Sequence, residues 1–164
     1  MRNYTSTVDA EDSIFRIEQK LIQFGASHIL KEYDDAKQVS ALSFTLLVDR
    51  ETLRRLPIRM PANVEAVRKV LWGQVRPGGN RQQKLAKVAQ QAVRTAWKLT
   101  LDWLDVQLSM IEMGQAEAAQ VFLPYVRCSG ERTFYEVIKA DGYRALPGLP
   151  APKSNEDIED AEIS

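Results

Sequence analysis

The feature that most constrains the fold is one long stretch without glycine or proline, residues 81 to 113, which lies between a Pro-Gly-Gly turn and Gly114. Its C-terminal half is apolar over most of its circumference on a helical projection and includes Trp97, Trp103 and Leu104. A helix that is apolar on nearly all sides must be buried. We therefore predict one long central helix against which the rest of the chain packs.

The N-terminal region carries a second helical pattern. Residues 10 to 24 place apolar side chains three and four positions apart, which is the spacing of an amphipathic helix. Asp9 is expected to cap this helix, with Asp12 completing a capping box, and Gly25 is expected to end it. Residues 4 to 8 are short and β-prone.

Three segments that follow have strand patterns. HILKEY and VSALSFTLLV, separated by the turn DDAK, predict a hairpin, and LPIRMP predicts a short edge strand. On the second strand, period-two alternation places four apolar side chains on one face: Leu42, Phe44, Leu46 and Val48. Pro61 is expected to open a helix over about residues 62 to 75. The buried side of that helix is predicted to carry Val64, Val67, Leu71 and Val75.

The remaining segments complete the predicted architecture. QAEAAQVFL reads as a short helix that stops at Pro124, and RTFYEVIKADGYRAL reads as a last strand or helix. This order predicts an α+β domain in which a small antiparallel sheet packs on helices, with one long central helix. We expect a single domain over residues 1 to 146, followed by a disordered acidic tail over residues 147 to 164.

Composition excludes several kinds of chemistry. The chain has 164 residues, of which 45% are apolar, but no apolar run is long enough to cross a bilayer. The first residues lack the apolar core of a signal peptide, so we expect a cytoplasmic protein. Cys128 and His28 are the only residues of their types, which leaves no internal disulfide, no ordinary zinc site and no expected cofactor. The carboxylates Glu32, Asp34 and Asp35 are interpreted as turn formers and surface charges rather than metal ligands.

The net charge of zero hides an uneven distribution. Residues 50 to 98 hold twelve basic and two acidic side chains, whereas the segments on either side are acidic. On the predicted long helix, Lys84, Lys87, Gln91, Arg94 and Lys98 fall on one face, and acidic residues follow toward the C-terminus. This polarity opposes the helix dipole, so we expect groups outside the helix to compensate for it.

The basic segment RPGGNRQQK, residues 76 to 84, adds a turn next to this face. Mobile cations and exposed amides near a helix start are suited to phosphate, which predicts contact with a nucleic-acid backbone. Trp72, if exposed, could stack on an unpaired base. The candidate interface contains Arg76, Arg81, Lys84, Lys87 and Arg94, with Arg54, Arg55, Arg59, Arg68, Lys69 and Trp72 as possible neighbours.

Other interpretations stay open. The basic face could be only a solvated helix surface. The acidic tail, which includes Glu156, Asp157 and Glu159, could occupy the basic patch, offer its charge to a basic partner, or only aid solubility. The protein could instead be a binding module that inhibits or recruits a host protein complex. An enzyme ranks last, because one histidine and one cysteine supply little catalytic material.

Four segments also resemble a family of uncharacterised small proteins from bacteriophages, prophages and related mobile elements. They are FGASHILKEYDD, LPIRMPANVEAVRKVL, AVRTAWKLTLDWLDVQLSMIE and VFLPYV, and PANVEAV and AWKLTLDW are the most recognisable parts. The resemblance covers about residues 3 to 140. It implies a phage protein that acts inside a bacterial cell, in DNA metabolism or against host defence, with a basic loop at RPGGNRQQK. It carries over no activity, cofactor or catalytic residue.

Overall fold

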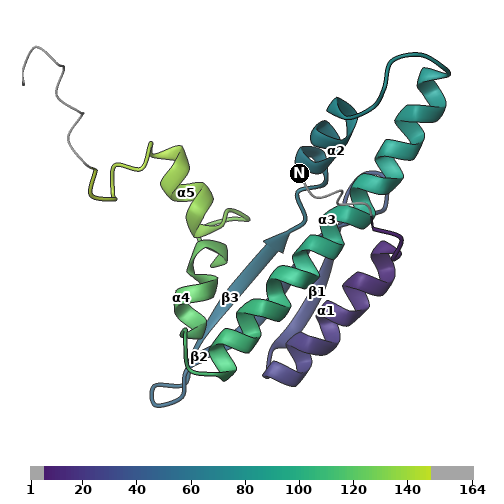
Figure 1. Ribbon diagram of the computed structural model, residues 1–164. Coiled ribbons are helices and arrows are strands. Elements are labelled where there is room, and N and C mark those ends of the chain that lie inside the picture. The colour runs from purple at the N-terminus through teal and green to yellow at the C-terminus, as the bar shows by residue number, and fades with distance from the viewer. Residues whose placement is uncertain (1–5, 149–164) are drawn as a thin grey trace, which may run out of the picture.

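A computed structural model describes residues 6–148, so the predicted tail from residue 149 onward lies outside the described residues. Figure 1 shows the elements in chain order. They are α1 (Ala10–Phe24), β1 (Ser27–Tyr33), β2 (Val39–Asp49), β3 (Arg54–Pro61), α2 (Val64–Gly73), α3 (Arg81–Glu112), α4 (Ala118–Phe122), the 3₁₀ turn η1 (Leu123–Tyr125) and α5 (Phe134–Ala140).

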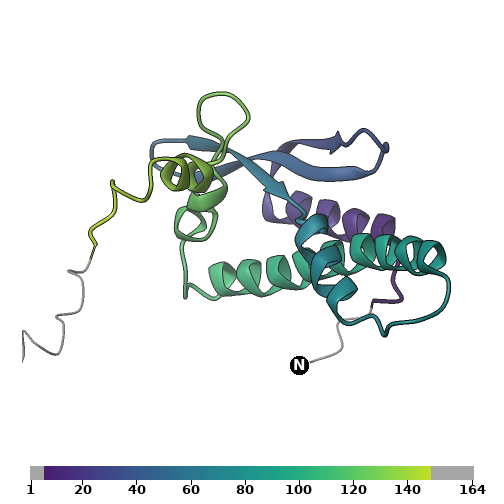
Figure 2. The ribbon, with the colours of Figure 1, turned by 90° about the horizontal axis from the view of Figure 1, so that it is seen from above.

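The three strands form one antiparallel sheet in the order β1-β2-β3. Figure 2 shows α1 and α3 on the same side of this sheet. The predicted α+β fold with a small antiparallel sheet and one long central helix is therefore confirmed. β3 is not a free edge along its whole length, because Val126 forms a bridge with Ile58 and the amide of Arg127 donates to the carbonyl of Pro57.

The core lies between the sheet and the two helices that cover it. Ile17 and Leu21 of α1 are fully buried, as are Trp97 and Leu104 of α3. Burying an apolar side chain of this size contributes about 1.5–3 kcal/mol, so this layer supplies most of the stability. Phe122 of α4 extends the core. The buried indole of Trp97 donates its N–H to the carbonyl of Val39 at 3.2 Å.

Most predicted elements agree with the structure, and the differences concern their ends. α1 begins and ends as predicted, and Gly25 has a φ of 97°, the left-handed conformation that favours glycine. Asp9 occupies the N-cap position of α1 as predicted, but its side chain makes no capping hydrogen bond, so the predicted capping box does not form. The part of the predicted strand at residues 4 to 8 that the structure describes, residues 6–8, is irregular.

The start of the second helix also differs from the prediction. Pro61 is the last residue of β3, and the helix begins at Val64. Asn63 is the cap, since its side chain accepts a hydrogen bond from the amide of Ala66 at 3.1 Å. The predicted buried side of this helix is only half-buried, and α2 contains no fully buried residue. α2 is therefore held less firmly than the helices of the core.

α2 packs on the N-terminal part of α3 and forms a helical hairpin with it (Figure 1). At 1.5 Å per residue, the 32 residues of α3 span about 48 Å. One end of α3 is thus joined to α2 by a loop, and the other end lies by α4. We call residues 64–87, which comprise α2, the loop and the first two turns of α3, the tip.

Candidate nucleic-acid interface

The loop of the tip has a conformation that its glycines permit. Gly78 and Gly79 have φ angles of 96° and 78°, which side chains with a Cβ rarely adopt. Asn80 then caps α3, and its side-chain oxygen accepts the amides of Gln82 and Gln83 at 3.0 and 3.3 Å. These two amides were part of the predicted phosphate site. Because Asn80 already satisfies them, they are not available to an anion without displacing the cap.

Lys84 has a structural role in the same loop. Its ammonium group donates to the carbonyl oxygen of Arg76 at 2.6 Å and also to the carbonyl oxygen of Gly78. The side chain is half-buried, and it joins α3 to the loop that precedes it. Lys84 therefore contributes mainly by fixing the loop, rather than as the mobile cation that the sequence suggested.

Trp72 and Arg81 meet across the helical hairpin. The guanidinium carbon of Arg81 lies 5.8 Å from the centre of the Trp72 ring, a distance typical of a cation–π contact. Trp72 is half-buried, so part of its ring reaches the surface. Both residues line a shallow hollow of about 280 Å³. Its other lining residues are Val75, Arg76, Pro77, Gly78, Gly79 and Lys84.

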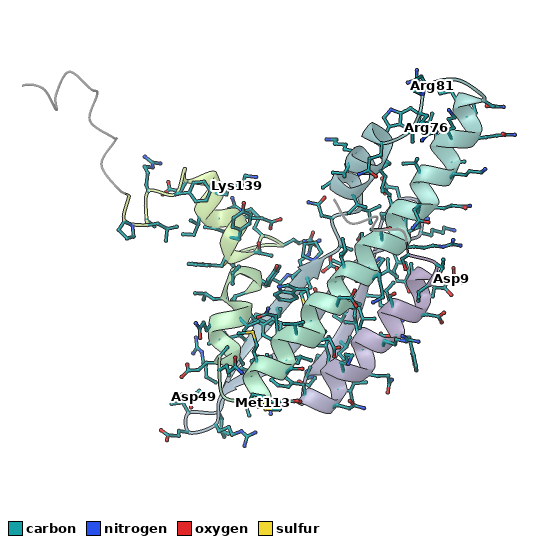
Figure 3. All side chains as sticks on the ribbon, in the orientation of Figure 1. Asp9, Asp49, Arg76, Arg81, Met113 and Lys139 are labelled. Atoms are coloured by element: carbon teal, nitrogen blue, oxygen red, sulfur yellow. The ribbon has the colours of Figure 1, made fainter. Side chains whose placement is uncertain are left out.

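The tip has a strong excess of positive charge. Within residues 64–87 there are six basic side chains and one acidic side chain, Glu65. Four of the exposed cations have no carboxylate partner among residues 6–148: Lys69, Arg76, Arg81 and Lys87. Figure 3 shows Arg76 and Arg81 together at this end of the molecule.

Two other predicted cations are paired: Arg68, which belongs to the tip, and Arg94, which lies farther along α3. Arg68 donates two hydrogen bonds to Glu65, both at 2.8 Å, and this contact holds the pKa of Glu65 below its ordinary value. Arg94 pairs with Asp9 of the segment before α1 at 3.2 Å. Both pairs are largely exposed, so each contributes little to stability, but each offsets a positive charge at the surface.

The structure places three predicted cations away from the tip. Arg54 and Arg55 are exposed at the start of β3, where Arg54 is opposite Asp49 in the strand register. Figure 3 shows Asp49 at the opposite end of the molecule from Arg76. These two arginines therefore cannot share a compact contact with the tip.

Arg59 is the third, and it lies on the face of the sheet that α1 and α3 leave uncovered. Its guanidinium group makes three contacts with Glu32, at 2.8, 2.9 and 3.1 Å, and the hydroxyl of Ser43 donates to the same carboxylate at 2.6 Å. Partial burial opposes the ionisation of Glu32, but the bonds from Arg59 and Ser43 together hold its pKa below the ordinary value. Arg59 is thus part of an internal ion pair.

Most side chains of the predicted basic face of α3 also have a hydrogen-bond or ion-pair partner within the chain. Gln91 donates to the carbonyl of Ser6, and Lys98 pairs with Asp102. From α1, Lys20 pairs with Asp105, just as Asp9 pairs with Arg94. These contacts with residues outside α3 supply the compensation that we expected for a helix whose charges oppose its dipole.

Acidic side chains elsewhere in the described residues do not form a metal site. Residues 6–148 contain no group of three histidine, cysteine or acidic side chains placed to hold a metal ion. Asp34, one of the predicted turn formers, accepts the amide of Gln38 at 2.9 Å in the β1–β2 turn. None of the helices in the described range has both the length and the apolar character needed to cross a membrane.

Two features of the tip were missed from the sequence. The side chain of Lys84 binds the loop carbonyls, and Val75 and Pro77 line the hollow beside Trp72. The only sequence signal was the Pro-Gly-Gly turn, which indicates a sharp loop but not which side chain will close it.

Comparison with known proteins finds no family model, no curated protein and no solved structure that matches this chain.

Proposed function

We propose that this protein binds the phosphate backbone of nucleic acid through the tip. The observation that carries this proposal is that four exposed cations without an ion-pair partner among residues 6–148 gather at the tip, whereas other such cations, among them Arg54 and Arg55, lie away from it. Within the tip Arg68 is paired with Glu65, but Lys69, Arg76, Arg81 and Lys87 have no ion-pair partner in the described part of the chain. Cations that are not offset by the chain's own carboxylates can neutralise phosphates and release their counterions.

The tip offers material for a small number of phosphate contacts. If its four unpaired cations each neutralise one phosphate, the logarithm of the binding constant should fall with the logarithm of the salt concentration with a slope of about −3 to −4. No groove-reading motif is visible in the sequence, so the proposed contact is with the backbone and is not specific for base sequence. The proposed setting is the one that the family resemblance implies, a phage protein acting in DNA metabolism inside a bacterial cell.

The test is a charge reversal with a matched control. The variant Arg76→Glu/Arg81→Glu removes two cations from the tip, and Arg54→Glu/Arg55→Glu makes the same change in charge at the other end of the molecule. Fluorescence anisotropy with labelled DNA and RNA, between about 50 and 200 mM salt, measures affinity and slope. We expect the tip variant to lose at least tenfold in affinity and about two units of slope, and the control to keep most of both.

Equal losses in the two variants would mean that net charge, and not the tip, governs binding. No binding by the unaltered protein at the lowest salt concentration would overturn the proposal. Circular dichroism and urea unfolding of both variants check that the fold is intact, which is expected because all four arginines are exposed.

A second candidate function, recruitment or inhibition of a host protein complex, is favoured by apolar side chains at the α1–β1 edge. Phe15 and Ile22 of α1 are 59% and 55% exposed, and Tyr33 of β1 is 62% exposed. Exposed apolar residues grouped in this way often mark protein contacts. Phe15→Ser/Ile22→Ser should then release a host protein that the charge-reversal variant still retains from bacterial lysate. Retention by both variants would count against this edge.

A further inference from the structure

We infer that the hollow beside Trp72 seats one unpaired base, so that the tip prefers single strands to duplexes. This inference rests on the proposed function and adds a substrate class to it. The hollow is lined by an aromatic ring, a pyrrolidine ring and two cations: Trp72, Pro77, Arg76 and Arg81. A nucleotide has the matching parts, a planar base and a charged phosphate joined by a sugar.

The lining of the hollow favours a base over a phosphate alone. Trp72, Val75 and Pro77 present apolar surface, which a phosphate group cannot use. Two backbone amides at the start of α3 that would suit a phosphate are occupied, since the side-chain oxygen of Asn80 accepts hydrogen bonds from Gln82 and Gln83. Lys84 is likewise bound to the carbonyls of Arg76 and Gly78. The apolar part of the lining therefore suits an aromatic ring, and Arg76 and Arg81 are the lining cations that remain for phosphates.

Arg81 prepares this site without losing its charge. Its guanidinium group lies 5.8 Å from the centre of the Trp72 ring and has no carboxylate partner among the described residues. Bases stack both on aromatic rings and on guanidinium planes, so a base can stack on the guanidinium group of Arg81 or take its place on the Trp72 ring. The same arginine remains free to meet the adjacent phosphate.

A base in a duplex cannot use such a site. Its two faces are covered by the neighbouring base pairs, and moving it out of the stack has an unfavourable free energy of a few kcal/mol. An unpaired strand avoids most of this cost. The geometry therefore points to a strand, gap or end with unpaired bases as the ligand, without a requirement for a particular base.

The experiment compares three probes that carry the same number of phosphates per strand: a single-stranded oligonucleotide, the same backbone with abasic sites, and the corresponding duplex. The oligonucleotide should bind about 5- to 100-fold more tightly than the abasic strand, which is the range that stacking of one base provides. Trp72→Ala should remove this preference and leave the salt slope unchanged, and Trp72→Phe should restore part of it.

A second measurement does not depend on a variant that folds. A strand with 2-aminopurine in place of a base reports stacking on an aromatic or guanidinium surface as a loss of fluorescence, and we expect quenching when the unaltered protein binds. Equal affinities for the oligonucleotide and the abasic strand, with no quenching, would overturn this inference and leave backbone binding in place. No binding of any probe would overturn the proposed function as well.

Discussion

One arginine of the body, by which we mean the described residues outside the tip, and two arginines of the tip differ in what surrounds their charge. In the body, Arg59 is held by Glu32, and the core places fully buried residues on α1, β2 and α3. In the tip, Arg76 and Arg81 have no carboxylate partner in the described part of the chain, and α2 has no fully buried residue. Charge density along a sequence therefore does not indicate how much charge is available at the surface.

The contacts of Arg59 and Arg81 show the reason. Glu32 fixes the guanidinium group of Arg59 and also cancels its charge. The ring of Trp72 contacts the guanidinium group of Arg81, and because this ring has no net charge it does not cancel the charge of the arginine. An arginine on an aromatic ring is thus ordered and still able to attract an anion. This difference is open to test at both regions.

The largest expected effect is on the stability of the body. Leu104 is fully buried between α3 and the sheet, so Leu104→Ala should lower the free energy of unfolding by about 2–5 kcal/mol. Leu71 of the tip is only half-buried, so Leu71→Ala should cost clearly less. Urea unfolding measures both. Similar losses at the two positions would show that the tip is as tightly packed as the body.

The next effect concerns the ion pair of the sheet. Glu32→Gln keeps the shape but removes the charge that Arg59 faces, and it should cost about 1–2 kcal/mol once solvent screening is taken into account. Glu65→Gln breaks the exposed pair with Arg68 and should lower the free energy of unfolding clearly less than Glu32→Gln does. Urea unfolding at neutral pH compares the two variants.

The same pair predicts a dependence on pH. Because the folded-state pKa of Glu32 is lowered, its contribution to stability is fully present above the ordinary glutamate pKa of about 4.3 and is lost as the pH falls through the folded-state value. The loss of stability between neutral and acidic pH should therefore be smaller in Glu32→Gln than in the unaltered protein. An identical pH profile for the two proteins would contradict this prediction.

Local patterns predicted the body of the fold well. The spacing of apolar residues predicted α1, and alternation predicted the β1–β2 hairpin, because each pattern is set by the geometry of a single element. On β2, Leu42, Phe44 and Leu46 are buried as predicted, whereas Val48 is only half-buried. The start of α2 was misplaced, since Pro61 suits either the end of an edge strand or a first helical turn. In the structure Pro61 pairs with Ala41 of β2 and therefore belongs to the strand.

The candidate site was less predictable, because it depends on contacts between distant segments. Arg94 and Arg76 looked equivalent along the sequence, yet Arg94 meets Asp9, which is 85 positions earlier in the chain. Arg54 belonged to the same basic segment but lies at the other end of the molecule (Figure 3). Neither the spacing of residues nor a sequence motif indicates which carboxylate a cation will contact. The paired and unpaired cations can therefore be distinguished only in the folded chain.

A smaller effect tests how the loop of the tip is fixed. Lys84→Met removes the bonds to the carbonyls of Arg76 and Gly78 but keeps an unbranched side chain of similar length. We expect faster amide hydrogen exchange in residues 74 to 80, by an amount that corresponds to about 0.5–1.5 kcal/mol of local stability. Lys87→Met, which removes an exposed charge without touching the loop, is the control. Equal exchange in both variants would show that Lys84 does not hold the loop.

The smallest expected effect is on the affinity for nucleic acid when the ion pair between Asp9 and Arg94 is broken. Asp9→Asn should free Arg94, and it should raise the affinity for nucleic acid no more than about threefold because an exposed ion pair is weak. Asp12→Asn makes the same change in charge in the first turn of α1, where no ion pair to Asp12 exists among residues 6–148. Anisotropy titrations should show a gain for Asp9→Asn beyond that for Asp12→Asn. Equal gains would mean that overall charge, and not the release of Arg94, accounts for the change, and the distinction between paired and unpaired cations would then lose its support at this position.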